Sequence, residues 1–228
     1  MPVPEYLLLL PPMMTIPIRP AVPADTPAIA HTLAAAFQHD PVAAWLVPDP
    51  DARFPVLRAV IALHLDGAIT NPDVRVDMMA ATAAVAVWHH HDHRSPAPSP
   101  ATDPAEAVTG PWATRFHTLD TLITAHRPAH AHHWLTGLAA HPYYQGQRLA
   151  EQLLHRHHQR IHATGQPVHG LVTTPHARDW LTAHGYHTGE PVRLPDGPCL
   201  WPVERGHCLV AAHSRTVLPH HTLRGQRR

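Results

Sequence analysis

The chain has 228 residues, which is enough for one well-packed domain but short for two. Its 17 cationic residues are all Arg and are balanced by 17 acidic residues, so the formal net charge is zero. Without a basic excess it has little to neutralise a phosphate backbone, which argues against nucleic acid as a partner. The two Cys, Cys199 and Cys208, are too few for a disulfide scaffold and fit no zinc spacing. We therefore expect a protein of the reducing cytoplasm.

The N-terminal segment differs from the rest of the chain. Residues 1–14 are expected to be a disordered tail or a misassigned extension, with translation starting at Met14. Their apolar run, 7–10, is far too short to span a bilayer, and no Lys or Arg precedes it as in a signal peptide. We assign one domain to residues 15–205 and a flexible tail to 206–228, and we expect no membrane contact.

The first half of the domain predicts a strand, helices and a strand pair. Asp25 precedes Thr26-Pro27, an N-cap followed by an early-helix Pro. The run at 84–88 is almost continuously apolar, as in a central strand. In chain order we predict a strand at 15–20, a helix from 26 to 37, an apolar segment at 43–47, a helix at 54–68, strands at 74–79 and 84–88, a loop at 95–105 and a helix at 112–125.

The second half alternates strands with helices. In chain order we predict a strand at 133–140, a turn at 141–142, a helix at 149–163 closed by Gly165, a strand at 168–173, a helix at 177–184 and a hairpin of 192–194 with 199–203. Because the alternation is confined to this half, we expect an α/β (α+β) fold with a mixed, mostly antiparallel sheet and helices on both faces.

The most informative segment is the turn between strand 133–140 and helix 149–163. Gln145-Gly146 lies between a strand end and a helix start, a geometry that directs consecutive backbone N–H groups to one spot. A pyrophosphate would suit that spot, but an ordinary strand-turn-helix with one Gly would look the same.

Residues 141–154, His-Pro-Tyr-Tyr-Gln-Gly-Gln-Arg-Leu-Ala-Glu-Gln-Leu-Leu, resemble the acetyl-CoA motif of the GCN5-related N-acetyltransferases, Gln/Arg-x-x-Gly-x-Gly/Ala. Gln145 matches its first position and Ala150 its last. Thr173-Thr174-Pro175, followed by His184-Gly185-Tyr186, resembles the Ser-Asn-Pro … Gly-Phe segment of the family. The segments 35–41, 84–88, 132–135 and 194–202 look like the bacterial branch that contains proteins similar to puromycin N-acetyltransferase.

The resemblance implies direct acetyl transfer from acetyl-CoA to a small-molecule amine, with a backbone N–H of strand 135–140 stabilising the oxyanion. It also implies which residues contact the cofactor: Leu138, Ala139, Ala140, Gln145, Gly146, Gln147, Arg148, Leu149, Ala150 and Thr174. Catalytic side chains are not assigned.

Two positions depart from the family pattern. Arg148 replaces the middle Gly of the loop, and it could obstruct the site, pair with a phosphate or lie in solvent in a first helical turn. Leu181 occupies the position of the Tyr that protonates the leaving thiolate. Water or a His could replace the Tyr, the thiolate could leave unassisted, or the protein could be a degenerate fold that binds acyl-CoA with little or no turnover.

The 25 His invite a metal interpretation, above all at residues 89–93. Alternate strand residues point to opposite faces, so His89 and His91 could share a metal but His90 could not join them. We expect a solvated strand end there and no metal site. We also expect His155, His157 and His158 to lie on the surface of their helix.

Overall fold

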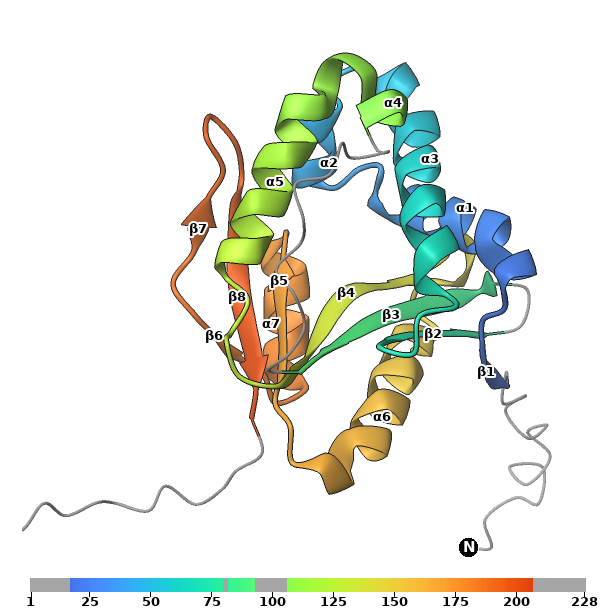
Figure 1. Ribbon diagram of the computed structural model, residues 1–228, viewed down its shortest axis with the longest axis vertical. Helices are drawn as coiled ribbons and strands as arrows, with labels where there is room; N and C mark the ends of the chain where they lie inside the picture. The colour runs from blue at the N-terminus through green and yellow to red at the C-terminus, as the bar shows by residue number, and fades with distance from the viewer. Residues whose placement is uncertain (1–16, 80–81, 93–105, 207–228) are drawn as a thin grey trace, which may run out of the picture.

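The computed structural model describes residues 17–79, 82–92 and 106–206, and it confirms the predicted fold class. The central feature is an eight-stranded sheet in the order β1-β2-β3-β4-β5-β8-β6, with β7 paired to β8 (Figure 1). Among the described strands, only β4 and β5 pair in parallel. The strands are β1 (Ile18–Pro20), β2 (Val74–Met79), β3 (Ala84–His91), β4 (His132–Ala140), β5 (Val168–Val172), β6 (His187–Thr188), β7 (Val192–Arg193) and β8 (Cys199–Arg205).

Helices cover both faces of this sheet. One face carries the helices of the first half of the chain, and α6 covers the other (Figure 1). Leu181 of α7 packs into the same cluster as Leu149 and Leu153 of α6, so α7 lies on the α6 face. The helices are α1 (Thr26–Phe37), α2 (Pro41–Leu46), α3 (Pro50–Ala68), α4 (Glu106–Thr109), α5 (Ala113–Ala125), α6 (Leu149–Ile161) and α7 (Pro175–Ala183). Within the described ranges, none of these helices has the length and apolar character needed to cross a bilayer.

The element boundaries follow local chemistry that the pattern only partly indicates. Helix α3 starts four residues before its predicted start, because Asp49 accepts a hydrogen bond from the Asp51 N–H and Pro50 occupies the first helical position. Asp25 does precede α1, but its carboxylate pairs with Arg19 instead of capping the helix. Strand β3 runs on to His91, and the two-residue strand β6 was not predicted. The predicted loop 95–105 lies outside the described residues.

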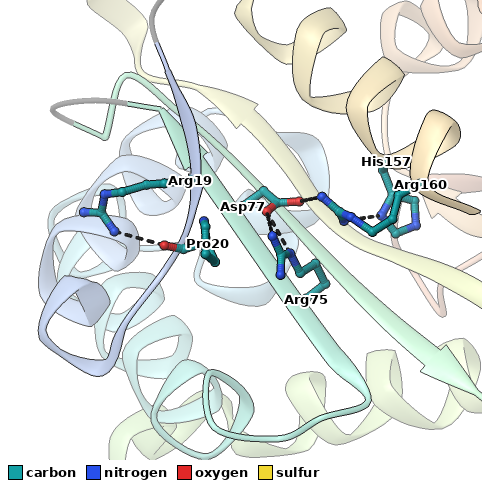
Figure 2. Close-up of polar contacts among 6 residues, drawn as sticks. All are labelled: Arg19, Pro20, Arg75, Asp77, His157 and Arg160. Carbon is teal, nitrogen blue, oxygen red and sulfur yellow. Dashed lines mark hydrogen bonds and ion pairs between the residues drawn. The ribbon is translucent and has the colours of Figure 1, made fainter.

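A buried carboxylate ties the sheet to α6. The Asp77 side chain, on β2, is only 2% exposed. It accepts hydrogen bonds from Arg75 on its own strand and from Arg160 near the end of α6, each at 2.8 Å (Figure 2). Two guanidinium partners satisfy a charge that would otherwise be too costly to bury. The contact therefore fixes the last turn of α6 against β2.

Two His predicted on the surface of α6 are instead buried. His157 is 2% exposed and stacks on Trp88 with ring centroids 3.8 Å apart, and His158 is 8% exposed and hydrogen-bonds the Tyr186 hydroxyl through Nε2. The prediction was wrong because both follow Leu153 and Leu154 at helical spacing and so continue the apolar stripe. Only His155 of the three is exposed, at 58% of its side chain.

Burial makes these imidazoles acid-sensitive. It lowers the pKa of His157 to about 2 and that of His158 to about 3, because the charged form is desolvated. His133, His89 and His169, at the sheet, have their pKa lowered to about 4 by the same cause. In the unfolded chain such groups take up protons near pH 6.5. The free energy of unfolding is therefore highest above about pH 6.5 and falls as the pH drops toward the folded-state pKa values.

We expect the substitution His157→Phe to remove part of this acid sensitivity. The Nε2 atom of His157 is buried with no hydrogen-bond partner among the described residues, and Phe can keep the stack on Trp88. At pH 5 the variant should be more stable relative to wild type than at pH 7.5, by about 2 kcal/mol, since each pH unit below 6.5 costs about 1.4 kcal/mol per His kept neutral. Urea unfolding at the two pH values measures this difference. The exposed control His176→Phe should show no such pH-dependent difference from wild type. If wild type and His157→Phe lose the same free energy of unfolding between pH 7.5 and pH 5, burial of His157 does not cause the acid sensitivity.

Candidate functional site

The sheet opens where β4 parts from β5. The two strands pair over three positions, ending at Leu135 opposite Gly170. Beyond this point β4 stays on β3 as far as Ala140, while no strand of the described ranges pairs with its other edge. The register between β3 and β4 shifts at Thr136, a β-bulge that increases the local twist. An unpaired backbone edge therefore lies inside the sheet, available to an extended ligand.

A loop at the end of β4 leads directly into α6. A 3-10 turn at Pro142–Tyr144 is followed by Gly146 at φ 81° and by Arg148 at φ 57°, and α6 begins at Leu149. Among the residues that the structure describes, no side chain caps α6, so none of them takes the N–H groups of its first turn. Open N–H groups and the positive end of the helix dipole make this loop a site for an anion, and a pyrophosphate fits the donor set.

The predicted cofactor-contacting residues divide into an exposed and a buried group. Residues 145–148 are exposed, whereas Leu149 is 4% exposed and its side chain belongs to the core. Ala139 is also buried, in a hydrophobic cluster that this β4 residue forms with residues of α1 and α3. Buried residues can reach a ligand only through their backbone, which is the role implied for β4. The remaining members, Leu138, Ala140 and Ala150, are half-buried.

Thr174 lies apart from the loop in sequence and has a structural task. Its Oγ1 accepts a hydrogen bond from the Ala177 N–H at 3.1 Å and so caps α7. The neighbouring Thr173 hydroxyl donates to Asp40, which also caps α2 by accepting from the Val42 N–H. The link joins the end of β5 to the loop between α1 and α2. Sequence analysis missed it, because nothing local relates positions 40 and 173.

Arg148 does not have the conformation expected of it. One of the three alternatives placed it in a first helical turn, but φ 57° and ψ 24° put it in the left-handed region that favours Gly. A Gly, as in the motif that this loop resembles, would adopt this conformation without strain. The side chain is 75% exposed and forms two 2.5 Å hydrogen bonds with Glu151. This contact lowers the pKa of the Glu151 carboxyl to about 2, so Glu151 is ionised at neutral pH.

Leu181, at the position of the missing acid, is 2% exposed and packs in the core with Leu149, Leu153 and Val203. A hydroxyl carried on a Tyr at this position would be placed in an apolar cluster, and the larger ring would overpack it. The exchange Leu181→Tyr is therefore no test of the missing proton donor.

The His-rich end of β3 is less solvated than predicted. His89 and His91 lie on one face of the strand, with ring centroids 6.0 Å apart, and both are half-buried. Burial lowers the pKa of each to about 4. His91 also stacks on His132 of β4 at 5.0 Å. The expected solvated strand end is thus a partly buried imidazole ladder, with its rings packed against one another across the sheet.

The loop also borders a depression of about 410 Å³ on the α1 side of the sheet. Helix α1 contributes His31 to its lining, and the loop contributes His141 and two tyrosines. Tyr143 is 87% exposed. An exposed aromatic ring beside an anion site is a surface on which a flat ring can stack.

No protein-family model matches the sequence, and no curated protein sequence matches it. Solved structures do match. A histone acetyltransferase HPA2 and related acetyltransferase of Corynebacterium glutamicum has 19% identity and a TM-score of 0.62 over 85% of this chain and 97% of that one. PaiA N-acetyltransferase of Thermoplasma acidophilum, solved with coenzyme A, has 11% identity and a TM-score of 0.56 over 85% and 100%. Polyamine N-acetyltransferase of Drosophila melanogaster has 15% identity and a TM-score of 0.55 over 84% and 99%.

These structural neighbours are N-acetyltransferases, and the shared architecture extends over nearly the whole length of each. At such identities the likeness establishes the fold alone. The chain therefore has the N-acetyltransferase fold, and its activity has to be argued from its own residues.

The left-handed conformation of Arg148 yields a stability prediction. Arg148→Gly should be more stable than Arg148→Ala by about 1 kcal/mol, because only Gly adopts this conformation without steric strain. Both variants lose the exposed pair with Glu151, so the comparison between them cancels that loss. Urea unfolding of both variants measures the difference. Equal stability of the two variants would show that residue 148 does not need the left-handed conformation.

Proposed function

We propose that the protein is an acetyl-CoA-dependent N-acetyltransferase of the GCN5-related family that transfers an acetyl group directly to a small-molecule amine. The observation that carries the proposal is the combination of an unpaired β4 edge with an uncapped α6 N-terminus at its end. An extended pantetheine chain can pair with the first, and a pyrophosphate can bind at the second.

The loop would hold the pyrophosphate mainly by its backbone. Gly146 contributes a positive φ without strain. The space beside its Cα is open, because no atom of the described residues, apart from its chain neighbours, lies within 4 Å of the point that a Cβ would occupy. Arg148 is bound to Glu151 but largely exposed, so its guanidinium can turn toward a phosphate. Gln145, Gln147, Leu149, Ala150 and Thr174 complete the proposed contact set.

The transfer itself would occur along the β4 edge. The amine nitrogen attacks the thioester carbonyl carbon, and the oxygen that becomes negative is stabilised by a backbone N–H of Leu138–Ala140. The carbon–sulfur bond then breaks, the amine loses a proton to a base, and the thiolate leaves. Since Leu181 is apolar and buried, the thiolate takes its proton from water or from a nearby His, or leaves unprotonated.

A small amine is the substrate class that we favour. The Drosophila neighbour is a polyamine N-acetyltransferase that forms N-acetylagmatine, and another neighbour is arylalkylamine N-acetyltransferase 2 of Aedes aegypti. Assignment to the branch similar to puromycin N-acetyltransferase and a cytoplasmic location are parts of the same proposal, as is the absence of nucleic acid and membrane partners.

The alternative is a degenerate fold that binds acyl-CoA without turnover. The specific observation in its favour is Leu181, which at 2% exposure leaves no hydroxyl at the position of the family's acid. A sensor or carrier needs the loop and the β4 edge but no proton donor. Binding and turnover therefore have to be measured separately.

The loop assignment predicts a charge effect at position 146. Gly146→Asp should weaken acetyl-CoA binding by about 10-fold or more, for which 1.4 kcal/mol of repulsion suffices. Gly146→Asn is the matched control, because it has the same size, carries no charge and tolerates positive φ. Calorimetric titration with acetyl-CoA measures both. If the Gly146→Asp variant binds acetyl-CoA as tightly as the Gly146→Asn variant does, the pyrophosphate does not lie at this loop.

Turnover discriminates between the enzyme and the degenerate fold. With acetyl-CoA and a panel of polyamines and arylalkylamines, we expect thiol release matched by N-acetylated product. A thiol-reactive dye and mass spectrometry give the two readouts. Tight binding of acetyl-CoA, with thiol release no faster than in buffer for every amine, would favour the alternative.

A further inference from the structure

Three side chains of types that can ligate a metal meet where the first turns of α6 approach the end of α7. Glu151 and His155 lie one helical turn apart, and His184 follows the end of α7. The Nε2 atoms of both His lie 3.7 Å from the same Glu151 oxygen, Oε1. One ligand atom from each of the three lies within 4.8 Å of the other two.

The hydrogen bonding of His184 makes this arrangement informative. Its Nδ1 lies 2.7 Å from the Trp180 carbonyl oxygen, which can only accept, so Nδ1 carries the hydrogen. In the neutral ring Nε2 is then a bare lone pair, and it faces a carboxylate oxygen, which is also an acceptor. A backbone carbonyl on Nδ1 with Nε2 free is the orientation found in metal-ligating His. Two acceptors that face each other are stabilised by a positive charge between them, which a proton on Nε2 or a bound cation can supply.

We propose that Glu151, His155 and His184 bind a divalent transition-metal ion, for which zinc is the best fit. Two imidazoles and one carboxylate suit zinc, cobalt or nickel, whereas magnesium and calcium prefer oxygen ligands alone. Ligands at about 2.0–2.1 Å from a tetrahedral zinc lie about 3.3 Å apart. The present 3.7 Å contacts reach that value by small side-chain rotations.

The burial of the three residues fits an open site. The side chains of Glu151 and His184 are 18% and 16% exposed, so packing holds two ligands, while His155 at 58% is free to rotate inward. Trp180 packs on the His184 ring at 4.2 Å between centroids and limits its rotation. Three protein ligands leave the fourth position to water or a small ligand.

Arg148 competes with the metal for Glu151. Its Nη2 donates a hydrogen bond to Oε1, the oxygen that both His approach, and its Nε donates one to Oε2. A metal on Oε1 displaces the Nη2 contact and frees the guanidinium at the loop. Metal binding and the position of Arg148 are therefore linked, whatever the loop binds.

The test is titration of the whole chain with zinc chloride and, separately, cobalt chloride, without other ligands. Calorimetry gives stoichiometry and affinity, and the visible absorption of cobalt reports tetrahedral coordination. We expect one ion bound per chain at this site. Each of Glu151→Gln, His155→Ala and His184→Ala should weaken it by at least about 10-fold, since even outer-shell changes cost about 10- to 100-fold.

The other His require matched controls. His126→Ala and His176→Ala remove exposed imidazoles elsewhere and should bind as wild type does. Arg148→Ala should bind zinc more tightly, because the competing cation is gone. Circular dichroism checks that each variant is folded. If a His variant unfolds, Glu151→Gln, which preserves the shape of the side chain, decides whether the metal binds at this site. The proposal is overturned if wild type binds no zinc or cobalt, or if folded Glu151→Gln binds both as wild type does.

Discussion

The structure depends on one strand that is paired fully on one side and only partly on the other. Strand β4 follows β3 to Ala140 but leaves β5 after Leu135, and a bulge at Thr136 marks the change. Unpaired backbone inside a sheet is normally costly, so a fold that preserves it has a use for the edge. The loop that follows this strand leads into α6, whose N-terminus no side chain of the described residues caps. The edge and the terminus together define the proposed site.

Much of this arrangement could be predicted from local pattern. The apolar run of β3, the strand before the loop and the Gln145-Gly146 turn are all features of nearby residues, and each was placed correctly. The fold class followed from the order of the elements. The prediction from sequence pattern was wrong where a polar residue occupies a core position, as His157 does. Its stack on Trp88 cannot be inferred from the hydrophobicity of single residues. It also failed for β6, which has only two residues and exists through its pairing with β8.

The site was less predictable than the fold, because its details depend on backbone angles and on contacts between distant segments. The left-handed conformation of Arg148 was not predicted, because sequence pattern does not specify φ. The Thr173–Asp40 bond and the approach of His184 to Glu151 join segments that only the folded chain brings together. The backbone geometry of the loop favours the proposed cofactor contacts. The cluster of side chains around Glu151, in contrast, was found only in the structure.

Gly170 sits at the vertex of the opening, as the last β5 residue paired with β4. A Cβ at this position would lie 3.3 Å from the Leu135 carbonyl oxygen and 3.4 Å from its Cβ. A side chain at this position would therefore crowd Leu135, so the close pairing of β5 with β4 beside the buried Trp134 favours Gly here. The point at which the two strands part is thus tied to a missing methyl group. An acyl chain that paired along the β4 edge, as proposed, would meet this close backbone contact at the inner end of the opening.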